Sequence, residues 1–166
     1  MLQDDNIEIA CKWFREELVI IGIRSFNPGL ISVFKHKKEV NDFASDLFRT
    51  IDLGIEEVKV ETENFDEWIT THDEEQFPLE KVNSMQNGVL SEFVNSRNTM
   101  AVSVENGVRL ISRMMFEQFG KDGFSRDMDI LSQSDGTVRL LSLVPALYAA
   151  FKCGKTVLID ELEHSI

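Results

Sequence analysis

The feature that most constrains the fold is a C-terminal run of apolar helix, glycine, apolar strand and paired carboxylates. Residues 137–151 place apolar side chains at helical spacing, and Gly154 is expected to end that helix. Residues 156–159 then form a continuous apolar run, typical of a strand that is buried on both faces of a mostly parallel sheet. The pattern therefore predicts an α/β fold.

Two acidic residues, Asp160 and Glu161, follow this strand directly. They place two carboxylates at the carboxyl end of a strand, where ligands bind in open α/β sheets. The first carboxylate can hold Mg²⁺, which prefers oxygen ligands, and the second can orient or deprotonate an attacking water. The alternative is a core strand followed by ordinary surface acids.

A second group of candidate residues lies where the 137–151 helix begins, at Ser134-Asp135-Gly136-Thr137. A helix N-terminus presents free N–H groups and the positive end of the helix dipole, so it binds phosphate well. Ser134 can add a hydroxyl donor, and Gly136 lets the backbone approach closely. The same residue types are also preferred as plain N-caps. The order of turn, helix, strand and paired carboxylates favours a nucleotide site.

Together, residues 133–148 and 154–166 resemble the signature and Walker B region of ABC-like AAA-family ATPases, a group related to abortive-infection and OLD-like prokaryotic proteins. Similarity upstream is weaker, so the specific motifs lie in 133–166. The fold implied is a partial P-loop NTPase sheet with helices and an antiparallel β-hairpin arm.

The resemblance implies a role for each candidate residue. Asp160 matches the Walker B magnesium carboxylate and Glu161 the catalytic glutamate. Ser134 and Gly136 match signature residues that contact the γ-phosphate of ATP held by an opposing protomer. ATP and Mg²⁺ are the implied cofactors, and a second ATPase protomer is the implied partner. An effector protein and a role in phage defence are further expectations.

The match to the family pattern has departures. The usual signature is Leu-Ser-Gly-Gly-Gln, whereas Asp135 replaces the first glycine and Thr137 replaces the glutamine, which leaves the direct phosphate geometry open. The sequence contains no phosphate loop of the form Gly-x-x-x-x-Gly-Lys-Ser/Thr. Gly154-Lys155-Thr156 resembles its end, but position 149 is alanine and the order of helix and strand is inverted. We expect a helix stop there, and a fragment that neither hydrolyses ATP nor binds ATP and Mg²⁺ tightly alone.

An acidic segment at residues 52–80 supports an alternative of another class. Eleven carboxylates there accompany one lysine, Lys59, in a chain of net charge −12. Such a segment repels nucleic-acid phosphates, although the basic run at 35–38 leaves nucleic-acid binding open. The alternative is a non-catalytic binding or regulatory module that presents the acidic 52–80 surface to a partner.

The 166 residues are expected to form a single partial ATPase domain. Residues 1–98 would be an insertion of helices and strands, 99–130 a β arm, and 131–166 the signature helix and Walker B strand. Asn106-Gly107 predicts a type I′ hairpin within the arm. No apolar run reaches the roughly 18 residues that span a bilayer, so no membrane partner is expected. Without a secretory signal or a cysteine framework, a cytoplasmic location is expected.

Smaller elements follow from local patterns. Helices are predicted at 5–17 and 38–51, strands at 18–21 and 55–62, and an exposed acidic connection, with a helical piece, at 63–76. Both tryptophans, Trp13 and Trp68, are expected to be core or half-buried anchors. Because neighbours on a strand point to opposite faces, at most one of Met114 and Met115 is expected in the core.

Overall fold

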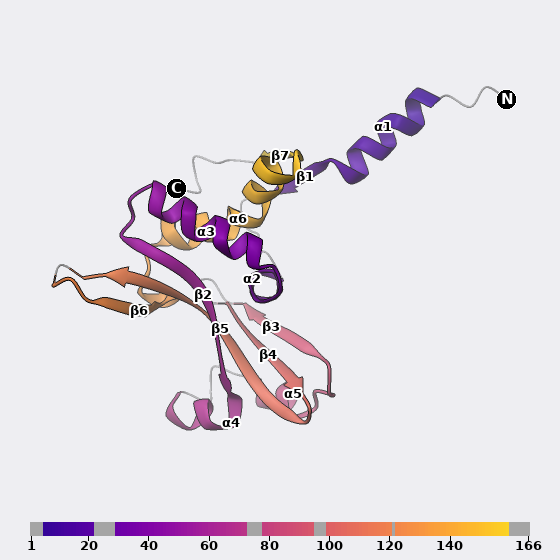
Figure 1. Ribbon diagram of the computed structural model, residues 1–166. Coiled ribbons are helices and arrows are strands. Elements are labelled where there is room, and N and C mark those ends of the chain that lie inside the picture. Colours follow the sequence, from indigo (N-terminus) through magenta and orange to yellow (C-terminus); the bar gives the residue numbers. More distant parts are fainter. Residues whose placement is uncertain (1–4, 22–28, 73–77, 95–98, 121, 160–166) are drawn as a thin grey trace.

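The computed structural model describes residues 5–21, 29–72, 78–94, 99–120 and 122–159. The helices and strands are α1 (Asp5–Glu16), β1 (Leu18–Ile21), α2 (Leu30–His36), α3 (Lys38–Thr50), β2 (Ile55–Asn64), α4 (Phe65–Trp68), η1 (Ile69–Thr71), α5 (Leu79–Asn83), β3 (Leu90–Val94), β4 (Thr99–Glu105), β5 (Val108–Phe119), β6 (Ser125–Asp129), η3 (Ile130–Ser132), α6 (Asp135–Cys153) and β7 (Thr156–Ile159). The fold is mixed α/β with mostly antiparallel strand pairing (Figure 1).

The larger sheet has five strands in the order β2-β5-β4-β3, with β6 also paired to β5. The long strand β5 is central, since β2 lies along one edge and β4 followed by β6 lies along the other. Asn106 and Gly107 have φ angles of 53° and 78° and join β4 to β5 as the predicted two-residue hairpin. The sheet therefore combines two strands that precede residue 98 in the sequence, β2 and β3, with three that follow it, β4, β5 and β6.

One face of this sheet is covered by α2, α3 and α6, and it carries the main core. Helix α3 contributes Val40, Ala44 and Phe48, which recur every four residues and so lie on one face. Ser45 Oγ accepts a hydrogen bond from Val58 N at 3.0 Å, which fixes α3 against β2. The predicted amphipathic helix at 38–51 is confirmed.

The opposite face of the sheet carries a second core cluster beneath α4 and α5. Phe65 and Trp68 of α4 are buried there, so the expectation of an exposed connection is wrong for this helical piece. Met114 and Met115 point to opposite faces of β5, and both are buried, at 0% and 8% exposure, because each face of the sheet carries a core cluster. The expectation that at most one of them is core is therefore wrong.

A separate parallel pair is formed by β1 and β7, with Val19 opposite Val157. Helix α6 connects the two sheets, because it contributes to the main core and also packs Leu143 and Ala146 on the inner face of the pair. On the outer face, Ile20 and Leu158 are 66% and 51% exposed. The expectation of a strand buried on both faces is therefore wrong for β7.

Helix α1 confirms the predicted helix but is exposed, and Trp13, expected to be an anchor, is 41% exposed. The two cysteines, Cys11 and Cys153, are free and exposed. Within the described part of the chain, no helix is both long and apolar enough to cross a bilayer.

An ion pair across β5 gives a prediction at alkaline pH. Lys59 Nζ of β2 lies 2.7 Å from Asp127 Oδ1 of β6. The hydrogen bond to Asp127 raises the pKa of Lys59 above its usual 10.5, although partial burial opposes this. The folded state therefore holds this proton more tightly, so the stabilisation is complete below the unfolded pKa and is lost as pH rises through the folded pKa.

We expect Lys59→Met to lower the free energy of unfolding by about 0.5–1 kcal/mol at neutral pH, because the pair is partly solvated. The deficit relative to the parent should shrink above pH 10.5, the usual lysine value. Urea unfolding of both proteins across neutral and alkaline pH measures it. A deficit that stays constant to the highest pH would contradict the assignment.

Candidate functional site

The predicted signature turn lies at the N-terminus of α6, a helix of 19 residues. Ser134 is the N-cap, with an extended backbone, and its Oγ accepts a hydrogen bond from Thr137 N at 3.1 Å. The same oxygen lies 2.8 Å from Thr137 Oγ1. The first helical bond, from Val138 N to Ser134 O, is 3.0 Å long. Ser134 thus acts as a cap, and its predicted contact with phosphate stays a prediction.

Gly136 lies in the first turn of α6, and neither its backbone conformation nor its described surroundings require a glycine there. A Cβ atom at this position would meet only Ser134 Oγ, at an ordinary 3.8 Å. Its φ is also outside the left-handed region that favours glycine. The space over the Gly136 backbone is therefore open to a group that approaches from outside.

The turn before α6 is held by side chains from the sheet. Asp129 Oδ1 accepts a hydrogen bond from Leu131 N at 2.9 Å and so caps η3. Gln133, only 7% exposed, accepts at its Oε1 from Gln118 Nε2 of β5 at 3.0 Å. Sequence reasoning missed Asp129 and Gln118. Asp129 had a signal, since aspartate often caps a short turn, whereas nothing local marks Gln118.

Arg113 of β5 extends this support across the sheet. Its guanidinium contacts Asp129 Oδ2 at 3.5 Å, Glu61 Oε2 at 3.2 Å and Glu63 Oε1, and it lies 5.7 Å from the ring centroid of Trp68. The Arg113 side chain is 15% exposed. Three acids on one face of the sheet thus share one arginine, which also holds the residue that caps η3.

At its other end, α6 leads directly into the strand that precedes the carboxylate pair. Gly154 ends the helix with φ 70°, and Thr156 begins β7. Lys155 Nζ donates to Glu16 O at 2.8 Å and pairs with Glu17 at 3.1 Å. The expected helix stop at Gly154-Lys155-Thr156 is confirmed.

The acidic candidates of the site follow β7 immediately. Asp160 and Glu161 lie outside the described residues, as does His164. Among the residues that the structure does describe, no three His, Cys, Asp or Glu side chains come together as a metal site. The assignment of Mg²⁺ to Asp160 stays a prediction.

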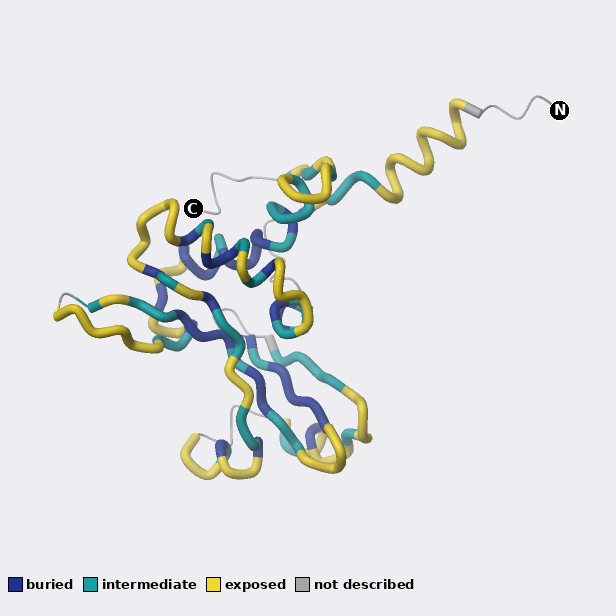
Figure 2. The backbone as a smooth tube through the Cα atoms, viewed as in Figure 1, coloured by how far each residue is buried: buried dark blue, intermediate teal, exposed yellow. Residues whose placement is uncertain are grey.

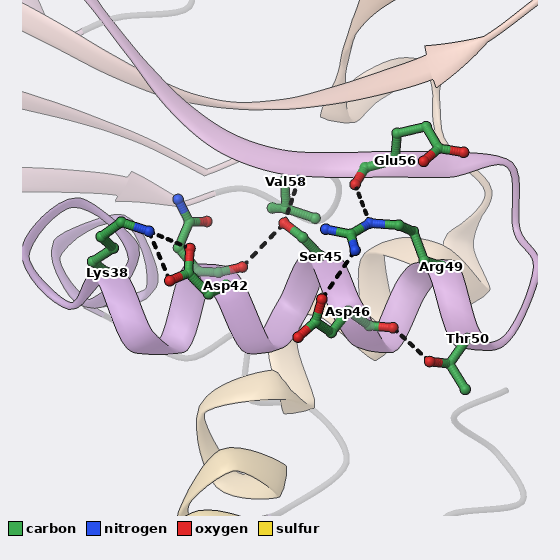
Figure 3. Close-up of polar contacts among 9 residues, drawn as sticks. Lys38, Asp42, Ser45, Asp46, Arg49, Thr50, Glu56 and Val58 are labelled. Atoms are coloured by element: carbon green, nitrogen blue, oxygen red, sulfur yellow. Dashed lines mark hydrogen bonds and ion pairs between the residues drawn. The ribbon is translucent and has the colours of Figure 1, made fainter.

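An acidic groove runs along α3 and the edge strand β2. It is lined by Asp42, Ser45, Asp46, Arg49, Glu56, Glu57 and Glu117. Figure 3 shows that part of this charge is paired. Arg49 donates to Glu56 O at 2.8 Å and pairs with Asp46 at 3.0 Å. The hydrogen bond from Lys38 to Asp42 raises the pKa of Lys38.

The comparisons with known proteins identify the family of the chain. A family model described as "AAA domain, putative AbiEii toxin, Type IV TA system" matches residues 12–166. No curated protein matches the chain, and no solved structure does. The match covers nearly the whole sequence and indicates a nucleotide-binding, ATPase-like domain. The chain belongs to this family of AAA domains.

Proposed function

We propose that this chain is the signature and Walker B part of an ATP-hydrolysing, ABC-like AAA-family ATPase that acts between two protomers, in a process such as phage defence. The observation that supports the proposal most is the arrangement around α6. A sheet-anchored turn capped by Ser134 starts the helix, and Gly154 turns it into a strand that pairs in parallel and leads to Asp160.

Each residue has a stated role in this proposal. The first N–H groups of α6 and the Ser134 hydroxyl bind the γ-phosphate of ATP held by the opposing protomer. Gly136 leaves the approach to the backbone open. Asp160 holds Mg²⁺, and Glu161 orients the attacking water. Because the sequence has no phosphate loop, we propose that the opposing protomer or a further segment supplies it, and that this chain alone is inactive.

Two substitutions separate phosphate binding from stability. Ser134→Asp keeps a good N-cap, and Gly136→Ala adds a methyl group that the chain can accommodate at 3.8 Å from Ser134 Oγ. Neither should destabilise the fold, and Gly136→Ala should add about 0.5 kcal/mol through helix propensity. Both should weaken phosphate binding by about tenfold or more, through charge repulsion and obstruction respectively.

The measurement is NMR of the ¹⁵N-labelled chain titrated with Mg²⁺-ATP and with inorganic tripolyphosphate. We expect weak, saturable shifts at the amides of residues 134–138 in the parent and none in either variant. Ser134→Asn, a neutral cap that lacks the hydroxyl, isolates the contribution of the backbone N–H groups and should keep the shifts at weaker affinity than the parent. Shifts that persist in Ser134→Asp would contradict the phosphate role. ATP turnover by the isolated chain, lost on Glu161→Gln, would contradict the claim that it is inactive alone.

A second candidate is a binding module, and the acidic groove along α3 favours it. Asp42, Asp46, Glu57 and Glu117 line the groove beside a single arginine, Arg49. Such a surface suits a basic protein segment rather than nucleic acid. A partner that is lost on neutralising Asp42 and Asp46, yet retained by Ser134→Asp, would favour this function over the first.

A further inference from the structure

Strand β2 forms a long edge of the larger sheet. It pairs with β5 on one side over ten residues, whereas the strands along the opposite side, β3 and β6, have five residues each. Strand β2 also contains no proline, which commonly protects an edge. An edge strand presents a row of main-chain N–H and C=O groups that another strand can pair with.

A hydrogen bond from β2 to α3 shows which groups of β2 point outward. Val58 N donates to Ser45 Oγ at 3.0 Å rather than to β5, so Val58 and Phe116 form a non-hydrogen-bonded pair of the antiparallel ladder. Such pairs alternate with hydrogen-bonded ones along a ladder. Val60 and Thr62 therefore also direct their N–H and C=O groups away from β5.

Helix α3 covers only the first part of this edge. Arg49 Nε donates to Glu56 O at 2.8 Å, and Val58 N is bonded to the same helix (Figure 3). In the part of the chain that the structure describes, no group bonds the outward N–H and C=O groups of Val60 and Thr62. Figure 2 shows an exposed stretch in this half of β2. Residues 60–64 are referred to below as the open edge.

The side chains that flank the open edge are mainly acidic. Glu57, Glu61 and Glu63 alternate along β2, so they share one face of the strand. Glu61 and Glu63 both pair with Arg113, and their side chains are still 45% and 40% exposed. A second copy of β2 on this edge would place acids beside acids, which is destabilising. The charge therefore disfavours a second copy and favours a strand that carries basic residues.

We propose that the open edge accepts an extended segment of a partner protein as an added strand, with lysine or arginine at alternate positions. The main-chain groups of Val60 and Thr62 bond this segment, and its basic side chains lie beside Glu61 and Glu63. The same segment reaches the acidic groove along α3, because Glu57 of β2 lines that groove. This inference rests on the binding-module function proposed above and names its kind of partner. It is independent of nucleotide binding.

The experiment measures, by fluorescence anisotropy, the binding of a labelled synthetic peptide of alternating lysine and threonine to the full chain. A second peptide has the same sequence with every main-chain N–H methylated, which removes its donors and leaves its charge unchanged. We expect saturable binding of the first peptide and at least tenfold weaker binding of the second. A peptide of alternating glutamate and threonine should not bind. Amide exchange at Val60 and Thr62 should slow when the first peptide is bound.

A substitution in β2 tests the same contact from the side of the protein. Thr62→Pro removes an outward N–H and no bond to β5, a position where an edge strand tolerates proline. It should weaken binding of the first peptide at least tenfold. Thr62→Val, which loses only the hydroxyl contact with Ser112 Oγ at 3.0 Å, is the matched control and should bind as the parent does. Circular dichroism checks that both variants remain folded, and the comparison of peptides on the parent does not depend on them.

The outcomes separate the added strand from the binding module itself. Equal binding of the methylated peptide would overturn the added strand and leave a module that holds basic segments by charge alone. Binding that is lost on neutralising Asp42 and Asp46, but not on Thr62→Pro, would also overturn it and would place the partner in the groove. A parent that binds neither basic peptide would overturn both the added strand and the recognition of basic segments.

Discussion

Replacing Phe116 with alanine should lower the free energy of unfolding by about 3–5 kcal/mol. Phe116 lies on the central strand β5 and is fully buried in the main core. Its ring meets Phe48 of α3 edge to face, with centroids 6.1 Å apart and planes at 81°. The substitution removes both the buried area and this ring pair, and α3 and α6 cannot both close the gap, because each also packs against other core residues.

Phe119 provides a matched control on the same strand. It is 59% exposed, so Phe119→Ala should change the free energy of unfolding by no more than about 0.5 kcal/mol. Denaturant unfolding, followed by circular dichroism, measures both. Similar losses for the two variants would mean that the burial of β5 against α3 is wrong. A loss at Phe116 with an altered denaturant slope would indicate that the unfolded or native state changed in compactness.

Elements with a strong local signal could be predicted from the sequence. The hairpin at Asn106-Gly107 needs positive φ at two successive residues, and few other sequences supply it so readily. The stripe of α3 and the glycine stop at Gly154 are likewise local. Such signals depend only on residues within one turn or one hairpin, so they are independent of the contacts that the rest of the chain makes.

Burial proved harder to predict, because it depends on which elements meet. Phe65 and Trp68 lie in the acidic 63–76 segment but are buried in a second core cluster. That cluster forms where α4 and α5 pack against the sheet. Conversely, the apolar residues of α1 predict a packed helix, and the chain leaves them exposed. Periodicity indicates which residues share a face of an element, but not whether another element covers that face.

In the candidate site, too, the local feature could be predicted from the sequence and the long-range contacts could not. The cap at Ser134 is a local feature, and the structure contains it. The residues that hold the turn, Gln118 and Arg113, lie on β5 and reach the turn only after the sheet has formed. No spacing rule marks such long-range partners, so the sequence could indicate the turn without indicating what fixes it.

A second large effect on stability is expected at the charge cluster around Arg113. Arg113→Met should lower the free energy of unfolding by about 2–4 kcal/mol, because it leaves three carboxylates facing one another on one side of the sheet. Those of Glu61 and Glu63 are 45% and 40% exposed, so the effect should fall below that of a fully buried pair. Because Asp129 also caps η3, amide exchange at Leu131 and at the start of α6 should speed up as well.

A second substitution tests whether charge, rather than lost packing against Trp68, accounts for this result. Glu63→Gln should destabilise the parent, where Glu63 pairs with Arg113, but should stabilise the Arg113→Met variant, where it relieves repulsion. Arg126, 57% exposed and paired with Asp122, is the control, and Arg126→Met should change stability by about 0.5 kcal/mol or less. If Glu63→Gln destabilises both backgrounds equally, the two residues are uncoupled. The loss of stability on Arg113→Met would then come from lost packing against Trp68 rather than from the charge of Arg113, since the guanidinium lies over that ring.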